Sequence, residues 1–257
     1  MSFFDELNQI IEPALNRPEY EIHPGVSIAT VTSLNDPDNL GRIKCKLVNM
    51  PDEAAGDLGW AFTASPLAGE QRGVFFLPNV GDMVLVAFED GDVSRPFVIG
   101  SIWGGSQTPP VKISDGKNES YIIKTPRKNT ITLSDTENKE SITVETPKGQ
   151  SIAFNDEKST ITLNDKDGNN SIIIDTANGN ISIKCQNKLT LSAGNQASIT
   201  LDGTSGNINI SGGQKISLGG VQIDIEAQGT ATLKASAQLS AESDGVMTIK
   251  GGMVKIN

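Results

Sequence analysis

The second half of the chain is an array of short repeats, and their length limits what the chain can fold into. Segments such as TITLSD, SITVET, SITLDG and NINISG recur there about every 7 to 11 residues. In most of them two aliphatic side chains point one way and Ser, Thr, Asn or Lys point the other, which is the period-2 pattern of a half-buried strand. Asn, Asp and Gly fill the gaps and supply tight turns. The array predicts a stack of about fifteen short β-strands.

A single repeat of this length cannot fold alone. Its two aliphatic side chains contribute roughly 3–6 kcal/mol when they are buried, whereas ordering some nine residues costs roughly 9–18 kcal/mol of backbone entropy. Ladder hydrogen bonds return about 1 kcal/mol each and leave part of this cost uncovered. Neighbouring repeats must therefore pair with each repeat on both sides.

The repeats are also too short to encircle a core. A single-chain parallel β-helix uses coils of about 20 residues or more, whereas these segments suffice for one face of a three-sided prism. We therefore expect an intertwined trimer with threefold symmetry, in which two further copies supply the other faces. About fifteen strands stacked at ~4.7 Å give a needle roughly 70 Å long. Strands interlocked between chains should make this needle stiff and slow to unfold.

Residues 21–105 have the pattern of a small β-barrel. The segments VSIATVT, RIKCKLV, WAFTAS, GDMVLVAF and PFVIGSIW are strand-like, and NDPDNLG and EDGD are turns between them. About five short strands in roughly 80 residues suit a closed barrel, which has no free sheet edge. GGSQTPP then marks a linker, assigned to residues 106–120, and the repeats occupy residues 121–257.

Residues 1–20 are expected to form a short docking helix, with Ser2 as its cap and Pro13 as its limit. An apolar stripe at helical spacing runs along it, and a helix this short needs a surface to pack on. That surface is either the barrel of the same chain or a partner protein. The residues assigned to docking on a partner hub are Phe3, Phe4, Leu7, Ile10 and Ile11.

Composition disfavours catalysis and nucleic-acid binding. The formal net charge is −10, and an acidic chain gains nothing from neutralising phosphates. Catalysis by Ser-His-Asp or Cys-His groups needs a histidine, and the one histidine, His23, has the setting of a loop residue. The carboxylate pairs Asp90–Asp92 and Asp165–Asp167 lie in Gly-containing turns, where Asp is expected for its local hydrogen bonds. We expect no enzyme activity, no cofactor, no metal and no nucleic-acid partner.

Several apolar residues are predicted to be core. The aromatic side chains at Phe75, Phe76, Phe88 and Trp103 fall among apolar positions, which argues against an exposed stacking surface for single-stranded nucleic acid. The two cysteines, Cys45 and Cys185, lie on apolar alternations in different modules and are predicted to be free thiols. With neither a signal-peptide pattern nor a long apolar segment, synthesis in a bacterial cytoplasm is expected.

One stretch of the barrel carries a specific resemblance. GVFFLPNVGDMVLVAFEDGDVSRPFVIGSIW, with GRIKCKL and SPLAGEQRG upstream, resembles the barrel of the phage baseplate assembly protein V family of contractile-tail spikes, which is related to the valine-glycine-repeat spikes of type VI secretion. The resemblance covers about residues 24–103 and implies an oligonucleotide/oligosaccharide-binding (OB) type barrel followed by a trimeric β-helical needle. The family-motif residues at matching spacing are Gly81, Asp82, Gly91, Asp92, Pro96 and Gly100.

Three departures from that family refine the expectation. Type VI spikes begin with a large hub-like region, whereas about 20 residues precede this barrel, so the resemblance implies a separate hub protein. The linker has no room for the lysozyme domain that some phage spikes carry. Some members bind iron at the tip through paired histidines, which this chain lacks. The chain end is either blunt and capped by a separate tip protein, or closed by Met253, Val254 and Ile256 plugging the axis.

The sequence thus predicts an all-β protein with an OB-fold barrel followed by an intertwined trimeric β-helix needle. The predicted function is the central spike of a contractile tail or injection system. In this role a homotrimer is seated on the baseplate hub of a phage or phage-like particle and pierces the target cell envelope when the sheath contracts. The alternative is a β-helical tail fibre that binds or degrades glycans, against which the scarcity of aromatic residues in the repeats speaks.

Overall fold

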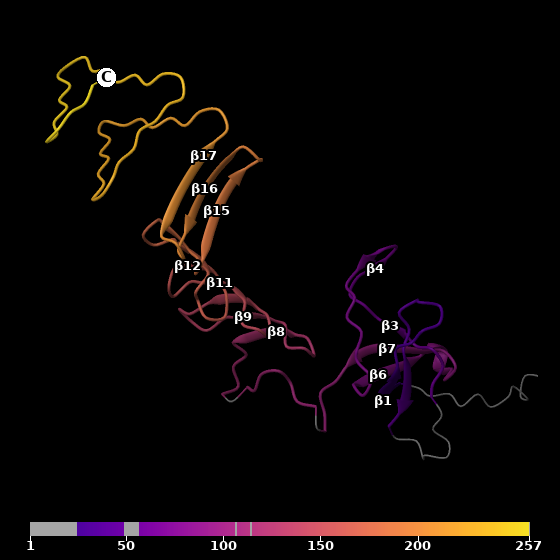
Figure 1. Cartoon of the computed structure of the whole chain (residues 1–257). Helices are drawn as coiled ribbons and strands as arrows, with labels where there is room; N and C mark the ends of the chain where they lie inside the picture. Colours follow the sequence, from indigo (N-terminus) through magenta and orange to yellow (C-terminus); the bar gives the residue numbers. More distant parts are fainter. Residues whose placement is uncertain (1–24, 49–56, 106, 114, 257) are drawn as a thin grey trace, which may run out of the picture. The chain divides into compact units, whose positions relative to one another are not determined.

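The computed structural model describes residues 25–48, 57–105, 107–113 and 115–256, and within them the chain is built from β-strands and turns (Figure 1). The helical geometry in these ranges is a single 3-10 turn, η1 (Glu89–Gly91). The chain divides into one compact unit that ends at Ile183 and a second that begins at Lys184. None of the described segments forms a helix with the length and apolar character that a bilayer crossing requires.

The barrel contains a five-stranded sheet with the order β2-β1-β6-β7-β3. Its ladders are antiparallel except for β3–β7, which is parallel. An antiparallel bridge between Ile43 and Ala61, just before β2 and β3, brings the two edge strands together as in a partly open OB barrel. The strands are β1 (Val26–Ser33), β2 (Lys44–Leu47), β3 (Phe62–Thr63), β6 (Met83–Phe88) and β7 (Pro96–Ser101).

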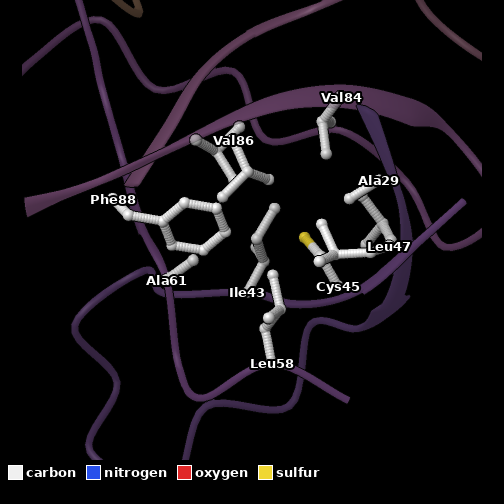
Figure 2. Close-up of a cluster of buried hydrophobic side chains, with 11 residues drawn as sticks. Ala29, Ile43, Cys45, Leu47, Leu58, Ala61, Val84, Val86 and Phe88 are labelled. Carbon is white, nitrogen blue, oxygen red and sulfur yellow. The ribbon is translucent and has the colours of Figure 1, made fainter. Parts of the chain in front are cut away.

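Alternating residues of these strands fill the barrel interior. On β6, Val84, Val86 and Phe88 are buried while the residues between them are not, as a period-2 strand with one core face requires. The predicted inward face of Ile43, Cys45 and Leu47 is buried as well. Figure 2 shows Ile43 in the middle of this cluster. The cluster is made of Ala29, Val31, Ile43, Cys45, Leu47, Leu58, Ala61, Val84, Val86, Phe88 and Val98.

Both cysteines are free thiols. Cys45 has no exposed surface, and this burial raises the pKa of its thiol to about 11. A thiol with so high a pKa is protonated and inert at neutral pH. Cys45 therefore packs as a small apolar residue.

A hairpin leaves the barrel between β3 and β6. We call residues 65–76 the arm; it contains β4 (Ala68–Gly69) and β5 (Arg72–Gly73), which pair antiparallel. Figure 1 shows the ribbon of β4 extending away from β3 and β7. At Gly73, φ is +147° and an added Cβ would lie 2.4 Å from the carbonyl oxygen of Leu67. Only glycine fits this close approach of the two arm strands.

The repeats form two antiparallel meanders in which each strand neighbours the next one along the chain. The first has seven strands and the second three. The seven strands are β8 (Ser120–Lys124), β9 (Thr130–Ser134), β10 (Ser141–Glu145), β11 (Ser151–Asn155), β12 (Thr160–Asn164), β13 (Ser171–Asp175) and β14 (Asn180–Lys184). The three are β15 (Lys188–Ala193), β16 (Ala197–Asp202) and β17 (Asn207–Gly212). Hydrogen-bonded ladders in this part of the structure therefore run within one chain.

The predicted strands after Gly212 are absent from the structure. Segments such as KISLGG, VQIDIEA and MTIKG were expected to continue the stack, yet residues 213–256 form no strand. In Figure 1 the yellow trace after β17 carries no strand arrows. Their side chains are exposed throughout these residues, and an extended segment without a neighbouring strand has no ladder to join. In the single chain these segments thus have no ladder, and their pairing between copies stays a prediction.

The packing of Ile43 predicts a large cost for its truncation. Ile43→Ala should lower the free energy of unfolding of the barrel by about 2–5 kcal/mol, because it removes a fully buried side chain and leaves a cavity. Urea unfolding followed by Trp60 fluorescence, in a Trp103→Phe background, measures this change. Val80→Ala is the matched control, since Val80 is 60% exposed and its truncation should cost about 0.5 kcal/mol or less. Equal effects of the two substitutions would contradict the assignment of the core.

Candidate functional site: an open apolar face on the repeat strands

The first repeat meander carries its apolar side chains in two columns that cross the strands. In the middle of the first column, Leu133 lies opposite Ile142, and Ile142 lies opposite Phe154. Because side chains alternate between the faces of a strand, both columns lie on the same face of the sheet. The first column is Tyr121, Leu133, Ile142, Phe154, Ile161 and Ile174, and the second is Ile123, Ile131, Val144, Ile152, Leu163 and Ile172.

This apolar face, formed by the two columns, is open in the single chain. Ile142 is 45% exposed and Leu163 is 48% exposed, and apart from Ile161 and Ile174 every member of the columns is more than a third exposed. Soluble monomers rarely expose so extended an apolar surface, and one that does usually uses it as an interface. The alternation that predicted half-buried strands is thus present, but the single chain does not bury the apolar half.

The opposite face of the same sheet carries small and mostly polar side chains at its centre. There Thr132 lies opposite Thr143, Thr143 opposite Ala153, and Ala153 opposite Thr162. Threonine is β-branched and suits a strand, and its hydroxyl is compatible with water. The two faces therefore differ in chemistry at the centre of the ladder, whereas the polar row ends on Ile122 and Ile173.

The second meander repeats the pattern in its own unit. Leu201 lies between Leu189 and Ile208, and Ile199 lies between Leu191 and Ile210. Leu191 and Ile210 are more than half exposed. This unit therefore also has two apolar columns that the single chain leaves open.

The turns between the strands are held by their own aspartates. Asp165 accepts hydrogen bonds from the backbone N–H groups of Asn169 and Asn170, and the Asn170 side chain lowers the pKa of the Asp165 carboxyl. Asp202 similarly caps the turn before β17 and forms an ion pair with Lys188 at 3.0 Å. Within the residues that the structure covers, no three His, Cys, Asp or Glu side chains gather in a way that would hold a metal ion.

The family-motif residues shape the turns at both ends of β6. Gly81 adopts φ +93°, and its N–H donates to the Val31 carbonyl at 2.9 Å, which fixes the entry to β6 beside β1. The Asp82 carboxylate accepts the N–H of Asn79 at 2.7 Å. Both contacts are internal to the barrel.

The remaining motif residues build the exit from β6 and the start of β7. Gly91 adopts φ +79° in η1, and the Asp92 carboxylate accepts the N–H and hydroxyl of Ser94, which lower the pKa of the Asp92 carboxyl. Pro96 begins β7. Gly100 lies opposite Leu85, next to a register shift between β6 and β7. The motif thus encodes barrel geometry in this structure.

The predicted docking residues and the predicted tip residues lie near opposite ends of the sequence, and the structure describes the tip residues alone. Phe3, Phe4, Leu7, Ile10 and Ile11 lie outside the described residues, so their assignment to hub docking stays a prediction. At the chain end, Met253, Val254 and Ile256 belong to no strand and are 78%, 52% and 89% exposed, respectively.

The predicted burial of the barrel aromatics was wrong in three of four cases. Phe88 is buried, but Phe75, Phe76 and Trp103 are 76%, 69% and 67% exposed. The two phenylalanines follow β5 on the arm, which leaves the barrel, and Trp103 follows the end of β7. A linear apolar pattern does not reveal that the chain has left the core at these points.

The turn after β1 contains a buried ionic network that was not predicted from the sequence. Asp36 is 7% exposed, and its carboxylate accepts the backbone N–H groups of Asp38, Leu40 and Arg42. The Arg42 guanidinium also donates to it, at 2.7 Å from Nη2 to Oδ1, and holds the pKa of the Asp36 carboxyl far below its usual range. The signal was present in NDPDNLGR, where an Asp precedes a turn that ends on an Arg.

The same network limits the charge that this side of the barrel presents. Arg42 bonds Asp38 as well as Asp36, and its guanidinium carbon lies 5.9 Å from the centre of the Trp60 ring. Lys44 Nζ lies 5.0 Å from the same ring. Since two carboxylates neutralise Arg42, the OB strands here do not present it as a phosphate contact.

Comparison with known proteins matches the barrel to a family. Residues 27–103 match the model of the type VI secretion system/phage-baseplate injector OB domain, which confirms the resemblance over these residues. The type VI secretion system spike protein VgrG3 of Vibrio cholerae is 30% identical over 90 residues, which cover 33% of this chain and 9% of that protein.

Of two further relatives, one matches over a longer stretch and the other over a shorter one. The spike protein VgrG1b of Pseudomonas aeruginosa is 30% identical over 106 residues, covering 38% of this chain and 14% of that protein. The actin cross-linking toxin VgrG1 of Vibrio cholerae is 29% identical over 63 residues, covering 24% of this chain and 6% of that protein. The matched segments thus span a small fraction of these curated relatives.

The Asp36–Arg42 pair, which lies within the matched barrel, predicts a pH dependence of stability. Because folding lowers the pKa of Asp36, the carboxylate stabilises the fold above its unfolded pKa of about 4, and this contribution is lost as the pH falls below that value. Asp36→Asn should therefore destabilise the barrel at pH 7, and its difference from the parent should shrink between about pH 4 and pH 2. Urea unfolding at each pH measures this difference. Asp90→Asn, at an 87% exposed side chain, should show little difference at any pH, and a pH-independent effect of Asp36→Asn would refute the ionic assignment.

Proposed function

We propose, on the premise that residues 27–103 are an injector OB domain, that this chain is the central spike of a contractile tail or injection system. In this role it is a homotrimer seated on a baseplate hub, and it pierces the target cell envelope when the sheath contracts. The observation that carries the proposal is the open apolar face of the repeat strands. In the sequence these strands come after the injector barrel and a linker.

Three copies of the chain would bury that face. A sheet with one apolar face can form one side of a prism whose interior is shared with two equivalent sheets. Side chains that are about half exposed each gain roughly 1 kcal/mol from complete burial. Two columns running across the six strands from β8 to β13 therefore supply on the order of 10 kcal/mol per chain.

The role is mechanical. The ladders of the meanders stack strand upon strand within each chain, so a load along the stack falls on hydrogen bonds and on the shared apolar interior. Separation of one sheet from its partners exposes both of its apolar columns at once. Dissociation of the trimeric shaft is therefore slow. Piercing by such a shaft requires no catalytic group, and we propose that the chain is not an enzyme.

The remaining assignments complete the assembly. Residues 213–256 have strand-like alternation without partners in their own chain, and in the trimer they would pair with the other copies. The tip would then either be capped by a separate protein or be closed by Met253, Val254 and Ile256. The N-terminal stripe would contact the hub. The protein would be made in a bacterial cytoplasm and assembled into the baseplate of a phage or phage-like particle.

Substitutions on opposite faces of one strand test the trimer. Ile142→Lys places a charge on the apolar face and should leave single chains, because three lysines would be buried in the shared interior. Thr143→Lys is its matched control on the opposite face of β10 and should keep the trimer. Native mass spectrometry should report about three times the 27.2 kDa chain mass for the parent and for Thr143→Lys. Negative-stain images should show rods for the same two proteins.

Two results would reject the proposed assembly. The first is a parent protein that is a single chain by native mass, since one sheet cannot close the shaft. The second is a trimer that persists in Ile142→Lys but dissociates in Thr143→Lys, since the polar face would then be the inner one.

A further inference from the structure

The arm is an exposed apolar surface that its own barrel does not cover. Every residue from Ala64 to Phe76 is exposed, and this run includes Leu67, Val74, Phe75 and Phe76. Phe75 and Phe76 are 76% and 69% exposed, so these two rings alone present roughly 250–350 Å² of mostly apolar surface. A patch of this size on a soluble domain marks an interaction site.

The arm is also built to hold one shape. At its start the Ala64 N–H donates to the Val98 carbonyl on β7 at 2.8 Å, and at its end Leu77 packs against the barrel core. Within it, the Val74 N–H donates to the Leu67 carbonyl at 2.9 Å. The Ser65 hydroxyl lies 2.6 Å from the Val74 carbonyl oxygen, to which it donates. A preformed hairpin loses little conformational freedom when it docks, which favours binding.

The two phenylalanines differ in what they contact within the chain. The ring of Phe75 leans toward Gly41, where an added Cβ would lie 3.3 Å from Phe75 Cε2. Phe76 lines the same hollow as Phe75 and Gly41, but it does not come within 4 Å of that added Cβ and is 69% exposed. We therefore take Phe76 as the side chain of the arm that contacts another molecule.

The barrel carries a second uncovered apolar surface, on the outside of its sheet. Across β1, β6 and β7, Val26 lies opposite Ala87, and Ala87 lies opposite Phe97. One step along the strands, Ile28 lies opposite Leu85, which faces Gly100. Nothing lies within 4 Å of the position of an added Cβ at Gly100, so this part of the surface is open. We call this surface the outer sheet face; its members are Val26, Ile28, Leu85, Ala87, Phe97 and Ile99.

A ring of copies needs two different surfaces that fit each other, one on each side of the subunit. The arm leaves the barrel after β3, which is at one edge of the sheet order, whereas the outer sheet face is centred on β1 and β6. The barrel thus has one projecting apolar surface and one flat apolar surface, and Phe62 on β3, which stacks on Phe97, adjoins both. A closed ring with head-to-tail contacts uses two such unlike surfaces.

The linker keeps neighbouring barrels close enough for this contact. β7 ends at Ser101 and β8 begins at Ser120, and a fully extended chain of that length spans at most about 60 Å. Barrels tethered to one shaft therefore meet at an effective concentration on the order of millimolar. Even a weak apolar contact forms under those conditions.

We propose that the arm of each chain packs across the outer sheet face of the next chain's barrel, with Phe76 as its main anchor, so that three arms close a ring at the base of the shaft. This inference rests on the trimer of the proposed function. It adds a second interface, separate from the apolar columns of the repeats.

Photo-crosslinking in the full-length chain tests the contact. Phe76→p-benzoylphenylalanine keeps an aromatic ring at the position, and irradiation of the trimer should give covalent dimers and trimers on a denaturing gel. Mass spectrometry of these species should place the crosslinks in peptides that contain β1, β6 or β7. Phe154→p-benzoylphenylalanine is the control, because Phe154 lies on the repeat strands, and its crosslinks should fall within the repeats.

Limited trypsin digestion gives a second readout in the same trimer. Arg72 is exposed on the arm of the single chain, and docking should protect the bond that follows it. Phe76→Ser should raise the rate of cleavage there by about tenfold or more, as expected from the loss of one buried phenylalanine contact. Val80→Ser, an exposed apolar position outside the arm, should leave that rate unchanged.

The outcomes separate the two proposals. A parent protein that is a single chain by native mass overturns the trimer and the arm contact together. A trimer whose Phe76 probe gives no crosslink to another copy's β1, β6 or β7, or whose Arg72 is cleaved as fast as in Phe76→Ser, overturns the arm contact alone. Crosslinks to those strands together with a protected Arg72 establish it.

Discussion

A strand of five residues can satisfy its hydrogen bonds within a chain more easily than it can bury its side chains. In the repeat meanders every strand from β9 to β13 has a neighbour on both sides, so their ladders are complete. A single layer still has two faces, and here one of them is apolar from β8 to β13. The single chain therefore satisfies the backbone of these strands but leaves their apolar face without a cover.

The barrel solves the same problem by curling its sheet on itself. The bridge between Ile43 and Ala61 joins the edges, and the alternating residues of β6 then share one interior. Turns with unusual backbone angles make the curvature possible, and the motif glycines and aspartates are found there. The two halves of the chain thus have similar strands and similar turn residues, and what sets the barrel apart is the bridge that joins the edges of its sheet.

Much of this structure follows from local patterns in the sequence, and the failures have physical reasons. Alternation predicted the strands of both halves and the inward face of Ile43, Cys45 and Leu47, because strand geometry ties each side chain to one face. It did not predict that Phe76 is exposed, since an apolar residue on a projecting hairpin looks the same in sequence as one in the core. It also did not predict that the segments after Gly212 lack partners, because pairing is a property of neighbours and not of the strand itself.

The meander connectivity has a consequence for how the length of the repeat region can change. Each strand pairs with the next one in the chain and runs in the opposite direction, so removal of two successive repeats returns the chain to the same direction and the same facing residues. In-frame duplication or deletion of repeat pairs would therefore lengthen or shorten the stack while its cross-section stays constant. Gain or loss of repeat pairs thus changes the length of the strand stack in regular steps, which point substitution cannot do.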